Sequence, residues 1–142
     1  METFLVVGLG NPGSRYANTR HNAGTDFVHM LCEKYDVELT EKKKYKAFIG
    51  KFLLKDLEVI LSIPSLFMNQ SGKSVAPTVK GENIKLKNLL VVHDDLDLPP
   101  GVSKLKFSGG DGGHNGLKDI MKSLSGKKDF KRLRIGTVSY TH

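Results

Sequence analysis

The chain has 142 residues, of which 39% are hydrophobic and 26% charged, and these values predict one soluble globular domain with a sizeable core. No apolar run approaches the roughly 20 residues that span a bilayer, and no signal segment precedes the first apolar stretch. The single cysteine, Cys32, excludes an internal disulfide framework. We therefore expect a cytoplasmic protein without a membrane partner.

The net charge of +7 is concentrated in the C-terminal part of the chain. Residues 102–136 hold nine Lys and Arg against three Asp. Such a concentration favours a polyanionic partner, because neutralised phosphates release their counterions. A solvated lysine surface that keeps the protein in solution explains the same charge equally well, so charge alone identifies no partner.

Hydrophobic patterns along the chain predict strands that alternate with helices. The first strand is a continuous apolar run, which indicates burial on both faces, and Asn22 is placed as the N-cap of the first helix. Ser65 is placed to cap a short second helix. This order predicts an α/β fold, a single domain over residues 1–142 with a twisted mixed sheet flanked by helices on both faces. The expected strands cover 3–9, 46–54, 57–63, 89–92, 102–107 and a segment from 132, and the helices lie at 23–35, 67–69 and 117–124.

Gly8-x-Gly10-x-x-Gly13 matches the dinucleotide-binding fingerprint, and Glu33 lies twenty residues beyond it. That fingerprint needs its third glycine to open a helix whose N–H groups hold the pyrophosphate. Here Pro12 removes one N–H, no helical period follows Gly13, and Glu33 falls inside a predicted helix. The sequence therefore argues against a nucleotide site.

Three apolar strands are each followed by a polar residue: Asn11, Asn69 and Asp94. Ligands of open α/β sheets lie outside the carboxyl ends of the strands, where His21 and Asn115 are also expected. The set contains an imidazole, a carboxylate and three amides, with no obvious Ser or Cys nucleophile. This composition favours a histidine base that activates water, a carboxylate that fixes its tautomer, and amides that hold substrate oxygens.

Each of these residues also has a structural explanation. A metal site in the segment 93–97 is disfavoured, because three acids without a second histidine lack the usual ligand pattern of transition metals. We expect no metal and no organic cofactor. The structural alternatives are a purely structural role for His21, a helix cap for Asn115, a left-handed turn for Asn11, a turn for Asp94 or Asp95, and core positions for Phe67 and Met68.

Six motifs, in order and spacing, resemble the bacterial-type peptidyl-tRNA hydrolase family. The resemblance implies an enzyme that cleaves the ester between a peptide and the 3′-terminal ribose of tRNA, which recycles tRNA from stalled translation. It covers the chain from end to end. The motifs are V-G-L-G-N-P-G (7–13), T-R-H-N-A-G (19–24), F-M-N-Q-S-G (67–72), H-D-D-L-D-L-P-P-G (93–101), G-G-H-N-G-L-K (112–118) and R-L-R-I-G (132–136).

The resemblance also implies a role for each site residue. The expected partner is the acceptor end and 5′-phosphate of peptidyl-tRNA, and a monomer is the default oligomeric state. The implied catalytic residues are His21 as general base, Asp94 as the carboxylate that orients it, and Asn11 and Asn115 beside the ester. The implied binding residues are Tyr16, Phe67, Met68, Asn69 and Asn115 for the peptide, and Lys104, Lys106 and Arg134 for tRNA, the last two at its 5′-phosphate.

The end of the chain departs from the family, whose members continue well beyond the R-L-R-I-G motif. Residues 137–142 do not resemble that continuation, so we expect a domain that is truncated or divergent after about residue 136. The missing segment would leave apolar surface exposed. The alternative function is therefore a catalytically impaired, tRNA-binding fragment of the same fold. A small-molecule esterase is disfavoured, since the G-x-S-x-G elbow is absent.

Overall fold

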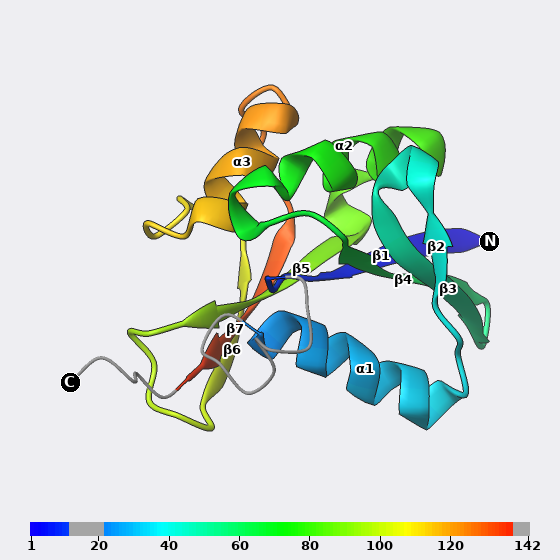
Figure 1. Ribbon diagram of the computed structural model, residues 1–142, viewed down its shortest axis with the longest axis horizontal. Helices are drawn as coiled ribbons and strands as arrows, with labels where there is room; N and C mark the ends of the chain where they lie inside the picture. Colours follow the sequence, from blue (N-terminus) through cyan, green and yellow to red (C-terminus); the bar gives the residue numbers. More distant parts are fainter. Residues whose placement is uncertain (12–21, 138–142) are drawn as a thin grey trace.

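The computed structural model describes residues 1–11 and 22–137, and His21 and Tyr16 lie outside these ranges. Figure 1 shows the arrangement of the elements. The strands are β1 (Glu2–Gly8), β2 (Thr40–Lys42), β3 (Ala47–Leu54), β4 (Leu57–Pro64), β5 (Leu89–Asp95), β6 (Ser103–Phe107) and β7 (Lys131–Gly136). The helices are α1 (Ala23–Tyr35), α2 (Gly72–Gly81) and α3 (Asn115–Ser123), with short 3₁₀ turns η2 (Lys43–Tyr45), η3 (Met68–Gln70) and η4 (Leu86–Asn88).

The strands form one seven-stranded sheet in the order β2-β3-β4-β1-β5-β7-β6. The four central strands β4, β1, β5 and β7 run parallel, while β3 pairs antiparallel with β4 and β6 pairs antiparallel with β7. The predicted mixed α/β sheet is confirmed. Because the central strands are parallel, their carboxyl ends meet at one edge, as the sequence predicts for a ligand site.

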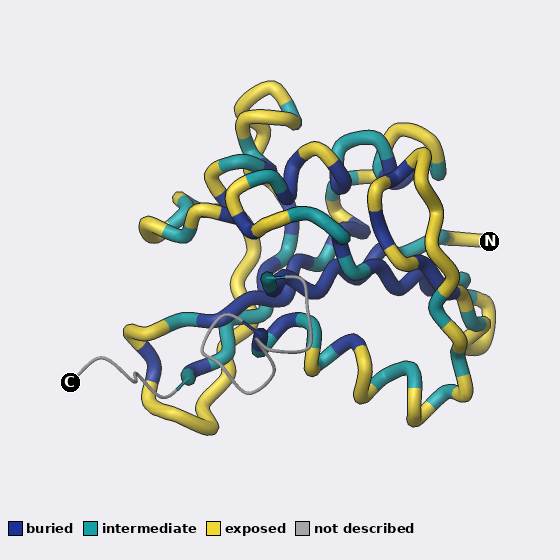
Figure 2. The backbone as a smooth tube through the Cα atoms, in the orientation of Figure 1, coloured by how far each residue is buried: buried dark blue, intermediate teal, exposed yellow. Residues whose placement is uncertain are grey.

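Helices cover both faces of the sheet, as predicted, with α1 on one face and α2 and α3 on the other (Figure 1). In β1, Leu5 and Val7 are fully buried on the face of α2 and α3, whereas Val6 is buried in the second cluster beneath α1. In Figure 2 most of the backbone of the central strands has the colour of buried residues. Burial of both faces explains why β1 has a continuous apolar run instead of an alternating one.

The N-terminus of α1 lies directly on the ends of the central strands. A Cβ at Gly24 would lie 2.2 Å from the backbone oxygen of Val92, and one at Gly8 would lie 2.3 Å from the backbone oxygen of Gly24. Only glycines allow so close an approach. Asn22 takes the predicted N-cap position and is 4% exposed, so the start of α1 is fixed against the edge where the strands end.

Three features differ from the sequence prediction. The helix α2 was not predicted, because its buried positions include the small polar residues Ser74 and Thr78 and it contains Pro77, so no apolar stripe marks it. Strand β2 was not predicted either, since its three residues are all exposed. The prediction that Ser65 caps a short helix is wrong, because η3 begins later and has Phe67 at its N-cap position, without a side-chain cap hydrogen bond.

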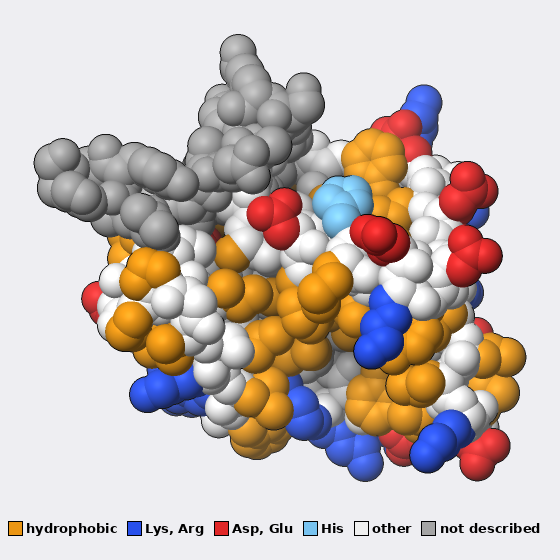
Figure 3. All heavy atoms as spheres, turned by 90° about the horizontal axis from the view of Figure 1, so that it is seen from below, with side chains coloured by type: hydrophobic (Ala, Val, Ile, Leu, Met, Phe, Trp, Pro, Cys, Tyr) orange, Lys and Arg blue, Asp and Glu red, His pale blue; other side chains and the backbone are white. Residues whose placement is uncertain are grey.

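Strand β6 lies last in the order of the described sheet and is exposed along its whole length. Leu105 and Phe107 are 66% and 56% exposed. Leu105 pairs with Leu133, which belongs to the cluster on the face of α1, and hydrophobic side chains gather on that face in Figure 3. None of the helices in residues 1–11 and 22–137 is long and apolar enough to span a membrane.

Candidate active site

The end of β1 is joined to the segment after β4 by a side-chain hydrogen bond. The backbone N–H of Met68 donates to Oδ1 of Asn11 over 3.2 Å. Asn69, the next residue in η3, is exposed at the same place. The two amides that the sequence predicts at strand ends therefore belong to directly connected segments.

Asp94 is 3% exposed and is the second-last residue of β5. Its Oδ1 accepts a hydrogen bond of 3.0 Å from Nε2 of His114. The other ring nitrogen of His114, Nδ1, accepts from the backbone N–H groups of Gly116 and Leu117, at 3.1 and 3.3 Å. In this arrangement Nε2 is the donor and Nδ1 the acceptor of the ring. His114 thus connects the carboxylate of Asp94 to the N-terminus of α3.

His114 is the N-cap of α3, so the alternative that Asn115 merely caps this helix is wrong. Asn115 is the first helical residue and is exposed. His114 was not predicted as a site residue, because histidine is not among the residues that usually cap helices. Its position directly after the glycine-rich loop and before the first helical residue is the signal that could have identified it.

A second histidine, His93, lies beside this pair. Its ring centroid is 4.7 Å from that of His114, in an edge-on arrangement, and its Nδ1–H donates to the backbone oxygen of Asp94 over 2.8 Å. Burial and the neighbouring His114 lower the pKa of His93 to about 4. Its Nε2 is buried without a hydrogen-bond partner among the described residues. His93 is therefore neutral at physiological pH.

The basic residues expected at the tRNA contact share one face of β6 and β7. Lys104 pairs with Arg134, and Lys106 pairs with Arg132, so all four side chains project to the same side of the sheet. Arg134 donates from Nε to Oδ2 of Asp95 over 2.7 Å. Burial alone would raise the pKa of Asp95, but hydrogen bonds from the Asp97 backbone and from Arg134 outweigh it and lower that pKa.

A cavity of about 560 Å³ connects the acidic strand end with Lys106, Arg132 and Arg134. Its walls come from the end of β5 and the loop after it, from the glycine-rich loop before α3, and from the strands β6 and β7. Negative and positive side chains therefore line the same hollow beside the carboxyl ends of the strands. Its charged lining includes Asp94, Asp95, Lys106 and Arg134.

Arg132 differs from the other basic residues because it is 1% exposed. Its Nη1 donates to three successive backbone oxygens, those of Ser108, Gly109 and Gly110, at 3.0, 2.8 and 2.9 Å. Nη2 donates to the backbone oxygen of Lys128, and burial lowers the pKa of Arg132. Sequence reasoning counted Arg132 in the basic concentration, whereas the structure uses it to hold the glycine-rich loop.

The remaining predicted residues divide between core and surface. Met68 is 8% exposed and belongs to the main core cluster, while Phe67 is 55% exposed, so the core alternative is right for Met68 and wrong for Phe67. Asp95 accepts from the Asp97 N–H as turn-forming residues do, and Asp94 lies within β5. In the part of the chain that the structure describes, no group of three or more His, Cys, Asp and Glu could hold a metal ion.

Known proteins resemble this chain over most of its length. The family model for peptidyl-tRNA hydrolase matches residues 5–140. The peptidyl-tRNA hydrolases of Pseudoalteromonas translucida and Tolumonas auensis are 51% and 53% identical over 132 residues, which is 93% of this chain and 68% and 67% of theirs. A crystal structure of peptidyl-tRNA hydrolase from Acinetobacter baumannii matches with a TM-score of 0.91 and 45% identity, over 99% of this chain and 70% of that one. These likenesses favour the enzyme over an impaired fragment, and with the carboxylate, amides and basic residues gathered at one edge they show that the chain belongs to the peptidyl-tRNA hydrolase family.

Proposed function

We propose that the carboxyl edge of the sheet is where this peptidyl-tRNA hydrolase cleaves the ester between a peptide and the 3′-terminal ribose of tRNA. The observation that carries the proposal is the position of Asp94, a buried carboxylate at the end of β5. It accepts a hydrogen bond from His114 at the N-terminus of α3 and lines the cavity that Lys106 and Arg134 also line. A carboxylate in this position can orient a catalytic imidazole beside an anionic substrate.

In the proposed mechanism, His21 is the general base. It removes a proton from a water molecule whose oxygen attacks the ester carbonyl, and Asp94 orients the imidazole and stabilises its protonated form. The tetrahedral intermediate then breaks its bond to the ribose oxygen, which takes the proton from the imidazolium and leaves as a hydroxyl. His21 receives this role from its place in the T-R-H-N-A-G motif. General-base catalysis of this kind supplies roughly 10²- to 10⁴-fold in rate.

The amides supply the polar contacts to the substrate. Because Oδ1 of Asn11 accepts from the backbone of Met68, the amide nitrogen of Asn11 is the group that remains to donate to the substrate. Asn115 is exposed at the start of α3 and can donate to the oxygen on which negative charge develops. Asn69 contacts the peptide backbone, and the motif positions of Tyr16, Phe67 and Met68 assign them to the same peptide. An unblocked aminoacyl-tRNA would leave such amides unsatisfied, which explains a preference for peptidyl esters.

The basic face binds the tRNA. Lys106 and Arg134 line the cavity and hold the 5′-phosphate, and Lys104 extends the contact along β6. Arg134 shares its guanidinium between Asp95 and the phosphate, since only its Nε is used by the carboxylate. Neutralised phosphates release counterions, so tRNA binding weakens steeply as salt rises. We place this activity in the cytoplasm and assign it to a monomer.

The test is release of peptide from an N-blocked aminoacyl-tRNA by the purified protein and by two variants. His21→Ala should lower turnover at least about 10²-fold. The matched control is His29→Ala, because His29 is an exposed histidine on α1 and should leave turnover unchanged. Near-normal turnover by His21→Ala would overturn the assignment of the base. Absence of release by the wild type, with tRNA still bound, would overturn the activity itself.

A further inference from the structure

We propose that Asp119 is a positioning residue for the peptide-binding side of this site and that it acts through η3 on Asn69. The inference rests on the proposed function, because it needs Asn69 to contact the peptide. Asp119 lies in the second turn of α3, directly after the G-G-H-N-G-L-K motif and outside it. Its carboxylate is directed at another helix.

The backbone N–H of Gly72 donates to Oδ2 of Asp119 over 2.7 Å. Gly72 is the first residue of α2, and Ser71 at the N-cap position makes no side-chain cap hydrogen bond. The first N–H groups of a helix have no partner within the helix and favour a negative charge nearby. Asp119 therefore caps α2 from a neighbouring helix.

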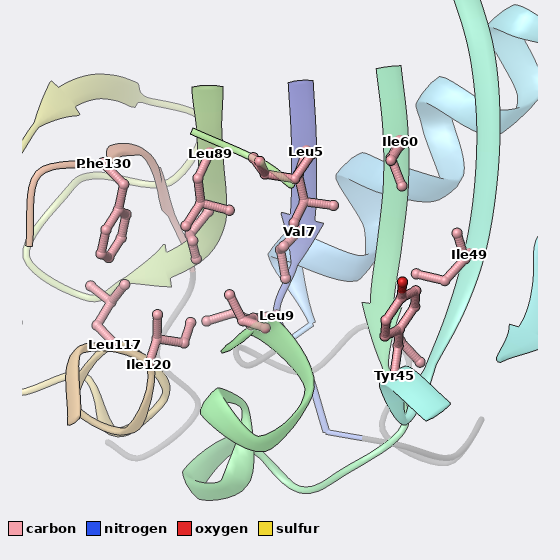
Figure 4. Packing of buried hydrophobic residues seen from close by; sticks show 14 of the residues in the cluster. Leu5, Val7, Leu9, Tyr45, Ile49, Ile60, Leu89, Leu117, Ile120 and Phe130 are labelled. Atoms are coloured by element: carbon pink, nitrogen blue, oxygen red, sulfur yellow. The ribbon is translucent and has the colours of Figure 1, made fainter. Parts of the chain in front are cut away.

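The packing around this hydrogen bond leaves no space for adjustment. A Cβ at Gly72 would lie 2.3 Å from the backbone oxygen of Asp119 and 2.3 Å from Oγ of Ser123. A Cβ at Gly116 would lie 2.9 Å from Sδ of Met68. The backbone of α3 thus touches the segment from Met68 to Gly72 at both ends. Figure 4 shows the apolar side of the same helix, where Leu117 and Ile120 lie beside Leu9 at the end of β1.

Asn69 lies between two polar attachments of this segment. Before it, the N–H of Met68 donates to Asn11, and after it, the N–H of Gly72 donates to Asp119. The side chain of Asn69 is exposed, so its direction depends on the backbone that these two hydrogen bonds hold. Loss of the second attachment frees one end of η3 and misdirects Asn69.

Asn115 is held differently, although it is on the same helix as Asp119. The N-terminus of α3 is attached to β5 through His114 and Asp94. Removal of the Asp119 carboxylate leaves those contacts unchanged. The proposal therefore separates the two amides: Asp119 controls Asn69 and has no control over Asn115.

The experiment is a pair of double-mutant cycles with peptidyl-tRNA turnover as the readout. Asp119→Ala should raise KM about tenfold and change kcat less than about twofold, because the lost contact acts in substrate binding. Asp119→Asn retains an oxygen acceptor and should recover most of the loss, and it also serves where the alanine variant folds poorly. The control Asp56→Ala removes an exposed carboxylate from the turn between β3 and β4 and should have no effect.

In the Asn69→Ala background, Asp119→Ala should cause no further loss, while in the Asn115→Ala background it should cause its full loss. Equal additivity in both backgrounds, or a fall in kcat with KM unchanged, would overturn the proposal and leave Asp119 as a stabilising residue of α3. If Asn69→Ala alone has normal KM, the role proposed for Asn69 fails together with this inference. If Asn69→Ala raises KM and Asp119→Ala has a normal KM, only the role proposed for Asp119 fails.

Discussion

Replacement of His114 by alanine should lower the free energy of unfolding by about 2.5 to 4 kcal/mol. The ring caps α3 through two backbone N–H groups, and loss of an N-cap costs about 1 kcal/mol. The same ring donates to the buried carboxylate of Asp94, and a hydrogen bond to a charged group contributes about 1.5 to 3 kcal/mol. The first cost concerns the helix and the second concerns the active-site carboxylate.

Replacement of His114 by asparagine separates these two costs. Asparagine is a good N-cap residue, so it restores the contact to α3, but its side chain is too short to reach Asp94 as well. The asparagine variant should therefore be about 1 kcal/mol more stable than the alanine variant. Both variants should lose turnover, because Asp94 loses a donor that holds it in place.

Urea unfolding measures both differences. With a slope of about 1 to 3 kcal/mol per molar urea, the alanine variant should show a midpoint lower by about 1 M or more. His29→Ala, an exposed change on α1, should remain within about 0.5 kcal/mol of the wild type. A loss below about 1 kcal/mol for His114→Ala would refute the energetic importance of these contacts. Equal stability of the alanine and asparagine variants would refute the capping role.

Three further changes test other parts of the structure. The pKa of His93 falls from 6.5 to about 4 on folding, so between these pH values the unfolded chain binds a proton that the folded chain does not. The free energy of unfolding should therefore fall by about 3 kcal/mol as the pH drops from 6.5 to 4. Urea unfolding at several pH values measures this, and a stability that does not change with pH would contradict it. Arg132→Lys should destabilise the fold by about 3 kcal/mol, because lysine keeps a buried charge while losing most of the hydrogen bonds. Arg132→Met removes the charge and should destabilise the fold less. A lower melting temperature for Arg132→Met than for Arg132→Lys would contradict this role of Arg132. Tyr45→Phe removes a hydroxyl donor to Glu82 and should lower the free energy of unfolding by about 1.5 kcal/mol, as measured by urea unfolding. A variant as stable as the wild type would contradict this prediction.

The sequence predicted those parts of the fold that depend on apolar patterns. The run before Gly8 and the one before His93 are buried on both faces, and the order of strands and helices was sufficient for a mixed α/β sheet. The strand-end rule also placed Asn11 and Asp94 correctly, since carboxyl ends of parallel strands share an edge. Their roles in catalysis remain proposals.

The parts that could not be predicted depend on contacts between distant segments. Nothing local shows that Asp119 caps α2 from another helix or that His114 joins α3 to β5. Arg132 was counted only in the basic concentration of residues 102–136; arginine is rarely fully buried, and only the fold reveals the loop carbonyls around it. The helix α2 was not predicted because most of its buried positions hold small or polar residues.

The exposed strand β6 has a consequence for the protein when it is free of RNA. An exposed last strand offers its backbone to other chains, and lysines on such a strand oppose edge-to-edge pairing. Here Lys104 and Lys106 alternate with the exposed Leu105 and Phe107. The side chains proposed to attract tRNA therefore also keep neighbouring molecules apart, and a variant without these two charges would aggregate as well as bind RNA poorly.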